Sequence, residues 1–433
     1  MSETTVGSTD GERTPEVADL PLNLFDLDPA AVAARFDQAR RRGTPLWLWP
    51  EVTVEGWREA LGTIETATHD VLTGAALPPD LAGDPETLGI AAFTSGMGPL
   101  LGYWIERGSI TAAPPVAALF RLHLRHNRLR TDRLQREAAA LATRMREADV
   151  EPTLLKGMHT AFAYFPEPGT RPMSDIDLLV PAERVAEAER VLRAAGYARA
   201  LSQGRLSRST WEPAGGKSLP RSLSLTHADD PWSLDLHTSL DRDFYGVGAA
   251  RLDRVAVRAF DHPLSTIPAR TLGQPLLALL LTSHTSEALR GLSLVRLVEL
   301  VLVIRRDVAA GLLDWDELMT AATAAGALRF LYPALDLTER LAPGTVPEPA
   351  LERLRAAATP SMRRVVAQLT PGRAQRLEGL SLEERFMWVD TARELISSVG
   401  YSLWPPSAGS SPKQILLIYR QRVWRLIRGA LGR

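Results

Sequence analysis

The chain of 433 residues contains no cysteine. It therefore has no disulfide framework, no thiolate zinc site and no cysteine nucleophile. It also lacks an excess of charge of either sign, because 50 lysine and arginine residues face 51 aspartate and glutamate residues. Proteins that bind nucleic acid generally carry a basic surplus, so nucleic acid is not an expected partner.

Long hydrophobic runs are missing as well. The longest apolar stretch, Pro275–Thr282, is far shorter than the roughly 20 residues that a membrane-spanning helix needs. The first 21 residues are polar and acidic and contain no apolar segment of the kind found in signal peptides. We therefore expect a cytoplasmic protein without a transmembrane segment, with a disordered tail over residues 1–20.

The residues that are present indicate a large folded chain. Hydrophobic residues make up 45% of it, enough for a sizeable core. The sequence predicts an α+β fold in which a β-containing segment is flanked by large helical N- and C-terminal regions. The predicted units are a helical region over 21–149, a sheet-containing core over 150–268, a helical region over 269–405 and a basic amphipathic helix over 406–433. For the last helix, docking on the protein body is favoured over a partner groove or a membrane surface.

The predicted core contains short strands and helices in alternation. VEPTLLKG and DIDLLV have the pattern of strands, and AERVAEAERVLRAAG has the pattern of a helix that ends at Gly196. Residues 198–220 look irregular. SLSLTHADDPWSLDLHTSL is typical of a hairpin, with His227 on its first strand. After about Ala269 the pattern predicts helices only.

Two carboxylates interrupt an apolar strand in the stretch MSDIDLLVP. Asp175 and Asp177 lie two residues apart, so they share one face of the strand at a separation of roughly 7 Å. Like charges that are desolvated repel each other, and a divalent cation between them removes the repulsion. Solvated acids at the end of a strand are the alternative, but the apolar flanks favour a metal site.

A third acid follows in the stretch SLDLHTSL. Asp235 and His237 share one face of their strand, and on a neighbouring strand Asp235 can join the first two acids. Three carboxylates on adjacent strands can hold two metal ions. Oxygen ligands favour Mg²⁺ or Mn²⁺. His237 is expected to orient a carboxylate or contact the bound substrate, and a purely structural histidine is the alternative.

Residues upstream of the acids are suited to phosphate. Lys156 and Gly157 stand at a strand-to-helix turn, where glycine allows close approach of a phosphate and the helix N-terminus offers free N–H groups. Arg171 has the fork geometry to bind a triphosphate through two hydrogen bonds. The alternatives are a solvated lysine and an arginine that neutralises the acids.

These motifs resemble a known family. LLKGMHTAFAYF, TRPMSDIDLLVP, VLRAAGY and LDLHTSL are similar to successive motifs of a bacterial uncharacterised nucleotidyltransferase family, within the DNA-polymerase-β-like nucleotidyltransferase superfamily. The resemblance is specific over residues 154–240. It implies a small mixed sheet flanked by helices and a divalent metal. It also implies that Gly157 is the phosphate-turn glycine and that Asp175, Asp177 and Asp235 are the metal-binding and catalytic acids.

The resemblance implies transfer of a nucleoside monophosphate from an NTP, such as ATP, to a hydroxyl or phosphate of an acceptor. We expect a small-molecule or peptide acceptor, with natural-product biosynthesis as one setting. Two alternatives stay open. The first is a transferase that uses another activated phosphate donor, such as a nucleotide sugar. The second is a catalytically silent nucleotide-binding scaffold.

Overall fold

A computed structural model describes residues 20–403, except 43–44, 201–206, 216–218, 290, 292 and 373–381. The tail expected over residues 1–20 therefore lies outside the described residues except for its last residue. The basic helix expected over residues 406–433 lies outside them entirely.

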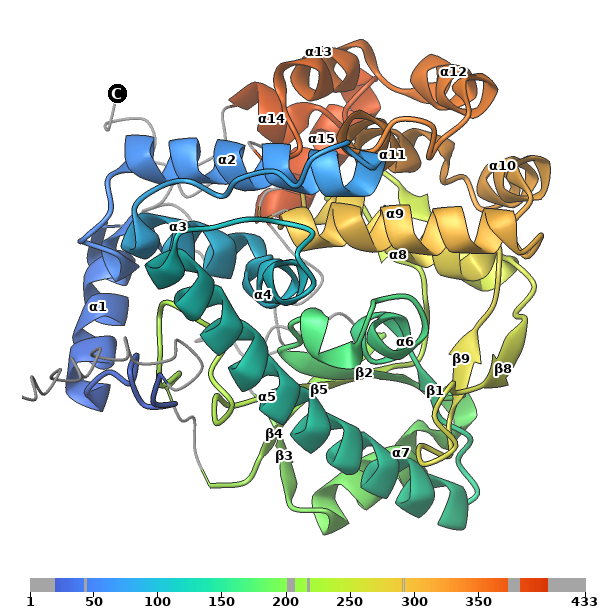
Figure 1. The fold of residues 1–433 in the computed structure, drawn as a ribbon. Coiled ribbons are helices and arrows are strands. Elements are labelled where there is room, and N and C mark those ends of the chain that lie inside the picture. Colours follow the sequence, from blue (N-terminus) through green and yellow to red (C-terminus); the bar gives the residue numbers. More distant parts are fainter. Residues whose placement is uncertain are drawn as a thin grey trace, which may run out of the picture.

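Within the described residues, seven strands form one mixed sheet at the centre of the molecule (Figure 1). Their order is β3–β4–β5–β2–β1–β9–β8. The pairs β2–β5 and β1–β9 are parallel and the other neighbours are antiparallel. The strands are β1 (Thr153–Leu154), β2 (Asp175–Leu179), β3 (Tyr197–Arg199), β4 (Arg208–Pro213), β5 (Ser233–His237), β8 (Ala259–Asp261) and β9 (Arg270–Leu272). A separate two-stranded sheet pairs β6 (Arg242–Asp243) with β7 (Ala249–Ala250).

Helices precede the sheet and interrupt it. They are α1 (Pro29–Arg42), α2 (Val54–Thr73), α3 (Pro85–Ser95), α4 (Gly98–Glu106), α5 (Pro114–Glu147), α6 (Lys156–Ala163) and α7 (Val185–Ala194). Figure 1 shows the long helix α5 running diagonally past the sheet, with α7 beside its C-terminal part. In α7 the buried residues are Ala188 and Leu192. Gly196 follows that helix with a φ of +85°, a conformation that glycine adopts without strain.

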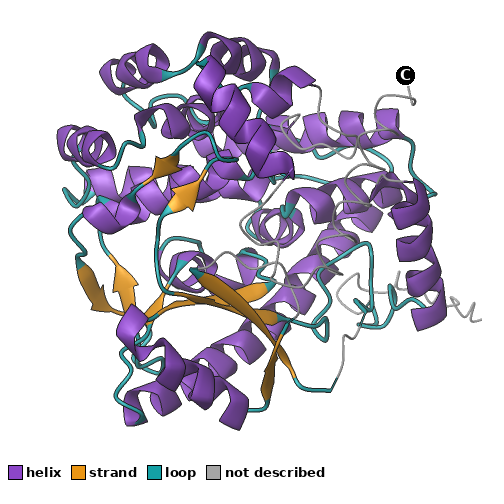
Figure 2. Ribbon diagram, turned by 180° about the vertical axis from the view of Figure 1, so that it is seen from behind, coloured by secondary structure: helices purple, strands orange, loops and turns teal. Residues whose placement is uncertain are grey.

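The remaining helices gather above the sheet in the view of Figure 1, on the side where α2, α3 and α4 also lie, and Figure 2 shows the same arrangement from behind. They are α8 (Leu276–Glu287), α9 (Leu294–Ala309), α10 (Trp315–Ala324), α11 (Leu328–Leu341), α12 (Glu348–Ala357), α13 (Pro360–Gln368), α14 (Leu382–Phe386) and α15 (Ala392–Leu403). No single helix among the described residues is long and apolar enough to cross a membrane. The pair α3 and α4 passes that test by length and composition only, with a bend of 115° between the helices.

The two faces of the central sheet have different chemistry. Ile176, Leu178, Leu234 and Leu236 are buried and belong to one hydrophobic cluster with residues of α5 and α7. A second, larger cluster holds the helices of the N- and C-terminal regions together. The opposite face of β2 and β5 carries Asp175, Asp177, Asp235 and His237, because side chains alternate along a strand.

The predicted α+β class is confirmed, and so are the strand at DIDLLV and the helix that ends before Gly196. The predicted hairpin is wrong. Residues 219–232 form no strand, because the Asp230 carboxylate accepts hydrogen bonds from the backbone N–H groups of Arg221 and His227 and holds an irregular loop. The antiparallel neighbour of β5 is instead β4, within a segment that was expected to be irregular.

The expectation of helices only after Ala269 is also wrong. Residues Arg270–Leu272 form β9, which pairs with β1 on one side and with β8 on the other. Three residues are too few for an alternating pattern to show in the sequence, and the strand depends on neighbours that lie far away along the chain.

Candidate active site

The acidic residues come together through the parallel pairing of β2 with β5. Asp177 is the register partner of Asp235, and Asp175 is the register partner of Ser233. Because the two strands run in the same direction and in register, their polar side chains form neighbouring rows on one face. Ligand atoms of Asp177, Asp235 and His237 all lie within 4.8 Å of one another. The structure thus places the three predicted acids on the neighbouring strands β2 and β5, and Asp175 is not part of the group whose ligand atoms lie within 4.8 Å of one another.

Asp177 is the most strongly held carboxylate of this group. Its Oδ1 atom lies 2.6 Å from Lys156 Nζ and 2.8 Å from His237 Nε2, and all three residues are buried. Burial opposes ionisation of Asp177. The charge of Lys156 and the hydrogen bond with His237 outweigh it, and they hold the pKa of Asp177 well below its usual range. Asp177 is thus an anion at neutral pH.

Asp175 is held far less tightly. Its one hydrogen-bonding neighbour among the described residues is the Ser174 hydroxyl, at 3.4 Å. Burial, and then the charge of Asp177, raise the pKa of Asp175 to about 6. A carboxyl group with so few partners beside a fixed anion is suited to binding a cation, whose charge favours its ionised form.

Asp235 is positioned from β4. The Thr210 hydroxyl donates to Asp235 Oδ1 at 2.6 Å, and Arg208 Nη1 lies 3.2 Å from Asp235 Oδ2. Sequence reasoning missed both β4 residues because the strand itself was not predicted. The alternation in RSTWEP is the signal that could have revealed it, since Ser209 and Trp211 are buried while Arg208, Thr210 and Glu212 are half-buried.

The residues expected to contact phosphate have protein partners. Lys156 contacts Asp177, as described above. Arg171 forms a two-bond fork with Glu299 of α9, from Nε to Oε1 at 2.9 Å and from Nη2 to Oε2 at 3.0 Å. Gly157 lies directly beneath Arg171, and a Cβ atom at position 157 would collide with the guanidinium. The need for glycine here therefore follows from the packing of Arg171.

Further cations lie around the acids. The pKa of His284, on α8, is lowered well below its usual value by burial and then by the positive charges of Lys156, Arg296, Arg242 and Arg208. Burial also lowers the pKa of Arg296, on α9, and the negative charges of Glu299, Asp175 and Asp177 oppose this lowering. Arg296 Nη1 is buried and has no hydrogen-bond partner among the described residues. Arg296 was missed as a site residue because it lies on a helix far along the chain from β2, and nothing local marks it as a neighbour of the acids.

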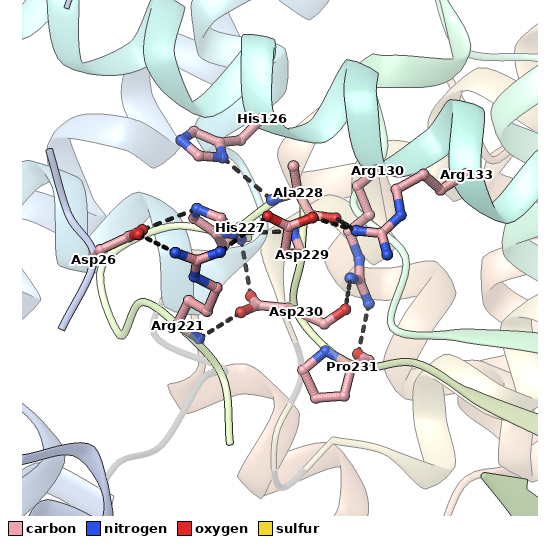
Figure 3. Close-up of polar contacts among 10 residues, drawn as sticks. All are labelled: Asp26, His126, Arg130, Arg133, Arg221, His227, Ala228, Asp229, Asp230 and Pro231. Carbon is pink, nitrogen blue, oxygen red and sulfur yellow. Dashed lines mark hydrogen bonds and ion pairs between the residues drawn. The ribbon is translucent and has the colours of Figure 1, made fainter. Parts of the chain in front are cut away.

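A cavity of about 410 Å³ lies elsewhere, between the N-terminal segment, α5 and the loop before β5. Among the residues that line it are Asp26, His126, Arg221 and His227. Figure 3 shows that Asp26 joins His227 and Arg221 there, while His126 approaches Ala228. None of the four acidic-face residues lines this cavity.

One known protein family matches the chain. A family described as "Uncharacterised nucleotidyltransferase" matches residues 82–343, which is more than half of the chain. The matched region contains β2, β5, helix α8 with His284 and helix α9 with Arg296. The chain belongs to this nucleotidyltransferase family. No curated protein and no solved structure matches the chain significantly.

Proposed function

We propose that this protein is a metal-dependent nucleotidyltransferase. It moves a nucleoside monophosphate from an NTP to a hydroxyl or phosphate of a small-molecule or peptide acceptor. The observation that supports this most directly is the cluster of Asp177, Asp235 and His237, whose ligand atoms lie within 4.8 Å of one another beside Asp175. Membership of a nucleotidyltransferase family supports the same reaction class.

The donor set fits a divalent metal. Carboxylate oxygens are the preferred ligands of Mg²⁺ and Mn²⁺, and Asp175 and Asp235 border the fixed anion of Asp177. The weakly hydrogen-bonded Asp175 supports the fit, because its carboxylate has no strong partner within the described part of the chain. A bound metal would supply positive charge that favours an ionised acceptor oxygen and a departing pyrophosphate.

The protein's own residues then have distinct tasks. Lys156 and His237 keep Asp177 ionised and fix its orientation. Thr210 and Arg208 hold the Asp235 carboxylate. The acceptor oxygen forms a bond to the α-phosphorus, the bond from that phosphorus to the bridging oxygen breaks, and pyrophosphate leaves. Asp235 is the group proposed to take the acceptor's proton.

The phosphate contacts are assigned differently from the sequence-based hypothesis. Arg171 is already paired with Glu299. Within the described part of the chain, Arg296 Nη1 has no hydrogen-bond partner, and the charges of Asp175 and Asp177 act on this guanidinium. Arg296 is therefore the proposed contact of the phosphate chain, while Arg208 stays with the Asp235 carboxylate. Arginine suits this role because its planar donors match phosphate oxygens.

The test is binding of ATP, CTP, GTP and UTP to the full chain by calorimetry, with and without Mg²⁺ or Mn²⁺. The test variant is Asp175→Ala/Asp177→Ala, and Glu352→Gln, which alters an exposed carboxylate on α12, is the control. The proposal expects metal-dependent binding of at least one NTP in the wild type and the control, with loss in the double variant. Failure of the wild type to bind any of the four would overturn the NTP assignment and direct the assay to nucleotide sugars.

A further inference from the structure

Strands β2 and β5, which carry the acids, begin at the same end of the sheet. Because β2 and β5 are parallel, the segment that ends at Ser174 and the loop that ends at Trp232 lie side by side there. The backbone N–H of Ser233 donates to the carbonyl of Ser174 at 3.3 Å. The distance between the two chain segments at this end of the sheet determines the distance between the carboxylates of the two strands.

One arginine of α5 contacts both segments. Arg130 is only 2% exposed. Its Nε donates to the Met173 carbonyl at 2.9 Å, before β2. Its Nη2 donates to the Pro231 carbonyl at 2.9 Å, before β5, and its Nη1 donates to the Asp230 carbonyl. Figure 3 shows Arg130 reaching from the helix to Asp230 and Pro231.

Among the described residues, no carboxylate forms an ion pair with Arg130. Asp230, the acid whose charge acts most strongly on Arg130, directs its carboxylate to the backbone N–H groups of Arg221 and His227. Burial lowers the pKa of Arg130, which shows that the site is costly for a cation. A guanidinium presents five donors in one rigid plane, so it can reach three carbonyls of two segments at once. A lysine ammonium has no such geometry.

We propose that Arg130 is a positioning residue for the nucleotidyl transfer proposed above, on which this inference rests. It fixes the starts of β2 and β5 relative to each other, and through them the separation of Asp177 from Asp235. Met173 lies two residues before Asp175, and Pro231 lies two residues before Ser233, which is the register partner of Asp175. With so few residues between contact and carboxylate, a displaced strand start displaces the ligand set.

The test compares Arg130→Lys with Arg133→Lys in the full chain. Arg133 is a matched control because it comes from the same helix and contacts the Ala228 carbonyl and Asp229, on the β5 side alone. Two quantities are measured: hydrogen exchange of the Ser233 amide, and Mn²⁺ affinity by calorimetry. Circular dichroism checks that each variant is folded. If Arg130→Lys does not fold, Arg130→Gln, which removes the buried charge, replaces it.

The expected result is faster exchange at Ser233 and about tenfold weaker Mn²⁺ binding in Arg130→Lys, the size of effect typical for groups that orient metal ligands. Arg133→Lys should change neither quantity by more than about twofold. Wild-type exchange, wild-type affinity, or equal effects in both variants would overturn the role of Arg130. A wild type that binds no Mn²⁺ would instead contradict the proposed function, and the exchange comparison would still decide whether Arg130 joins the two strands.

Discussion

At the scale of single residues, the glycine at position 157 is explained by the Arg171 side chain that packs against it. A side chain at position 157 would collide with the Arg171 guanidinium that pairs with Glu299. We predict that Gly157→Ala lowers the free energy of unfolding by about 1–3 kcal/mol, as overpacking of a filled site does. Gly62→Ala in α2 is the control, since a methyl group there meets nothing within 4 Å. That variant should gain up to about 1 kcal/mol from helix propensity.

Urea unfolding measures both glycine variants. Equal stabilities of Gly157→Ala and the wild type would show that Arg171 moves aside at little cost. The glycine would then have to be explained by the close approach of a ligand rather than by packing.

His126 predicts a dependence of stability on pH. Its Nδ1 accepts from the Ala228 N–H at 3.2 Å, so its Nε2 carries the proton and donates to the Leu22 carbonyl at 2.8 Å. Both ring nitrogens of the neutral imidazole are therefore hydrogen-bonded. A second proton on Nδ1 would break the hydrogen bond that this atom accepts. Burial, and then the charge of His227, lower the pKa of His126 to about 4 from a usual 6.5.

The sign of the effect follows from that depressed pKa. Between pH 6.5 and about 4 the unfolded chain binds a proton that the folded chain does not. Folding stability is therefore lost as the pH falls through this window, by up to roughly 1.4 kcal/mol per pH unit for this group. We predict a smaller loss in His126→Asn, measured by urea unfolding at pH 7, 6 and 5. Parallel pH profiles for the two proteins would contradict this role.

At the scale of elements, the sequence predicts the faces of the strands better than their neighbours. The alternation of Asp175 and Asp177 with apolar residues fixes one face of β2, and the same holds for Asp235 and His237 in β5. The parallel register that brings these two rows together is a tertiary property. The sequence predicted only that the two strands are neighbours. The β4 partner was missed because its pattern is short and is preceded by a polar segment.

Contacts between distant elements are invisible in a single sequence for a simple reason. Arg171 and Glu299 are separated by 128 positions, and nothing local marks either residue as the partner of the other. The same is true of Arg130, whose donors meet backbone carbonyls that every residue possesses. The charge and spacing of these residues suggest that they are functional. They do not indicate which residues they contact.

The pairing of α9 with the segment before β2 gives a prediction at this scale. Glu299 accepts from both Arg171 nitrogens and from the Thr160 hydroxyl, with its side chain 5% exposed. Glu299→Ala leaves a guanidinium that is only 14% exposed without its carboxylate partner, so we predict a loss of about 3 kcal/mol in the free energy of unfolding. Glu299→Gln keeps an acceptor oxygen and should lose less.

The control for this prediction is an ion pair on the surface. Glu317 pairs with Arg258 at 2.6 Å, but the side chains are 38% and 61% exposed. Glu317→Ala should cost no more than about 1 kcal/mol. Urea unfolding at neutral pH compares the three variants, and similar losses for Glu299→Ala and Glu317→Ala would show that the buried pair contributes no more than an exposed one.

At the scale of the whole molecule, the site depends on segments from most of the chain. Helix α5 contributes Arg130 and much of the cluster beneath the sheet, including Leu134 and Leu141. Strand β9 pairs with β1 and β8, and helices α8 and α9 bring His284 and Arg296. The sheet-containing segment predicted from the sequence, residues 150–268, contains neither α5 nor β9.

We therefore predict that a fragment of residues 150–268 has no cooperative unfolding transition. It would expose the apolar side chains of β2 and β5 that pack on α5, and β1 and β8 would each lose the partner strand that β9 provides. Sheets with an uncovered apolar face and unpaired edges are not stable alone. Circular dichroism during urea titration, with the full chain as control, measures this. A sharp transition in the fragment would show that the nucleotidyltransferase core folds without its helical flanks, and that the flanks act on a finished site rather than build it.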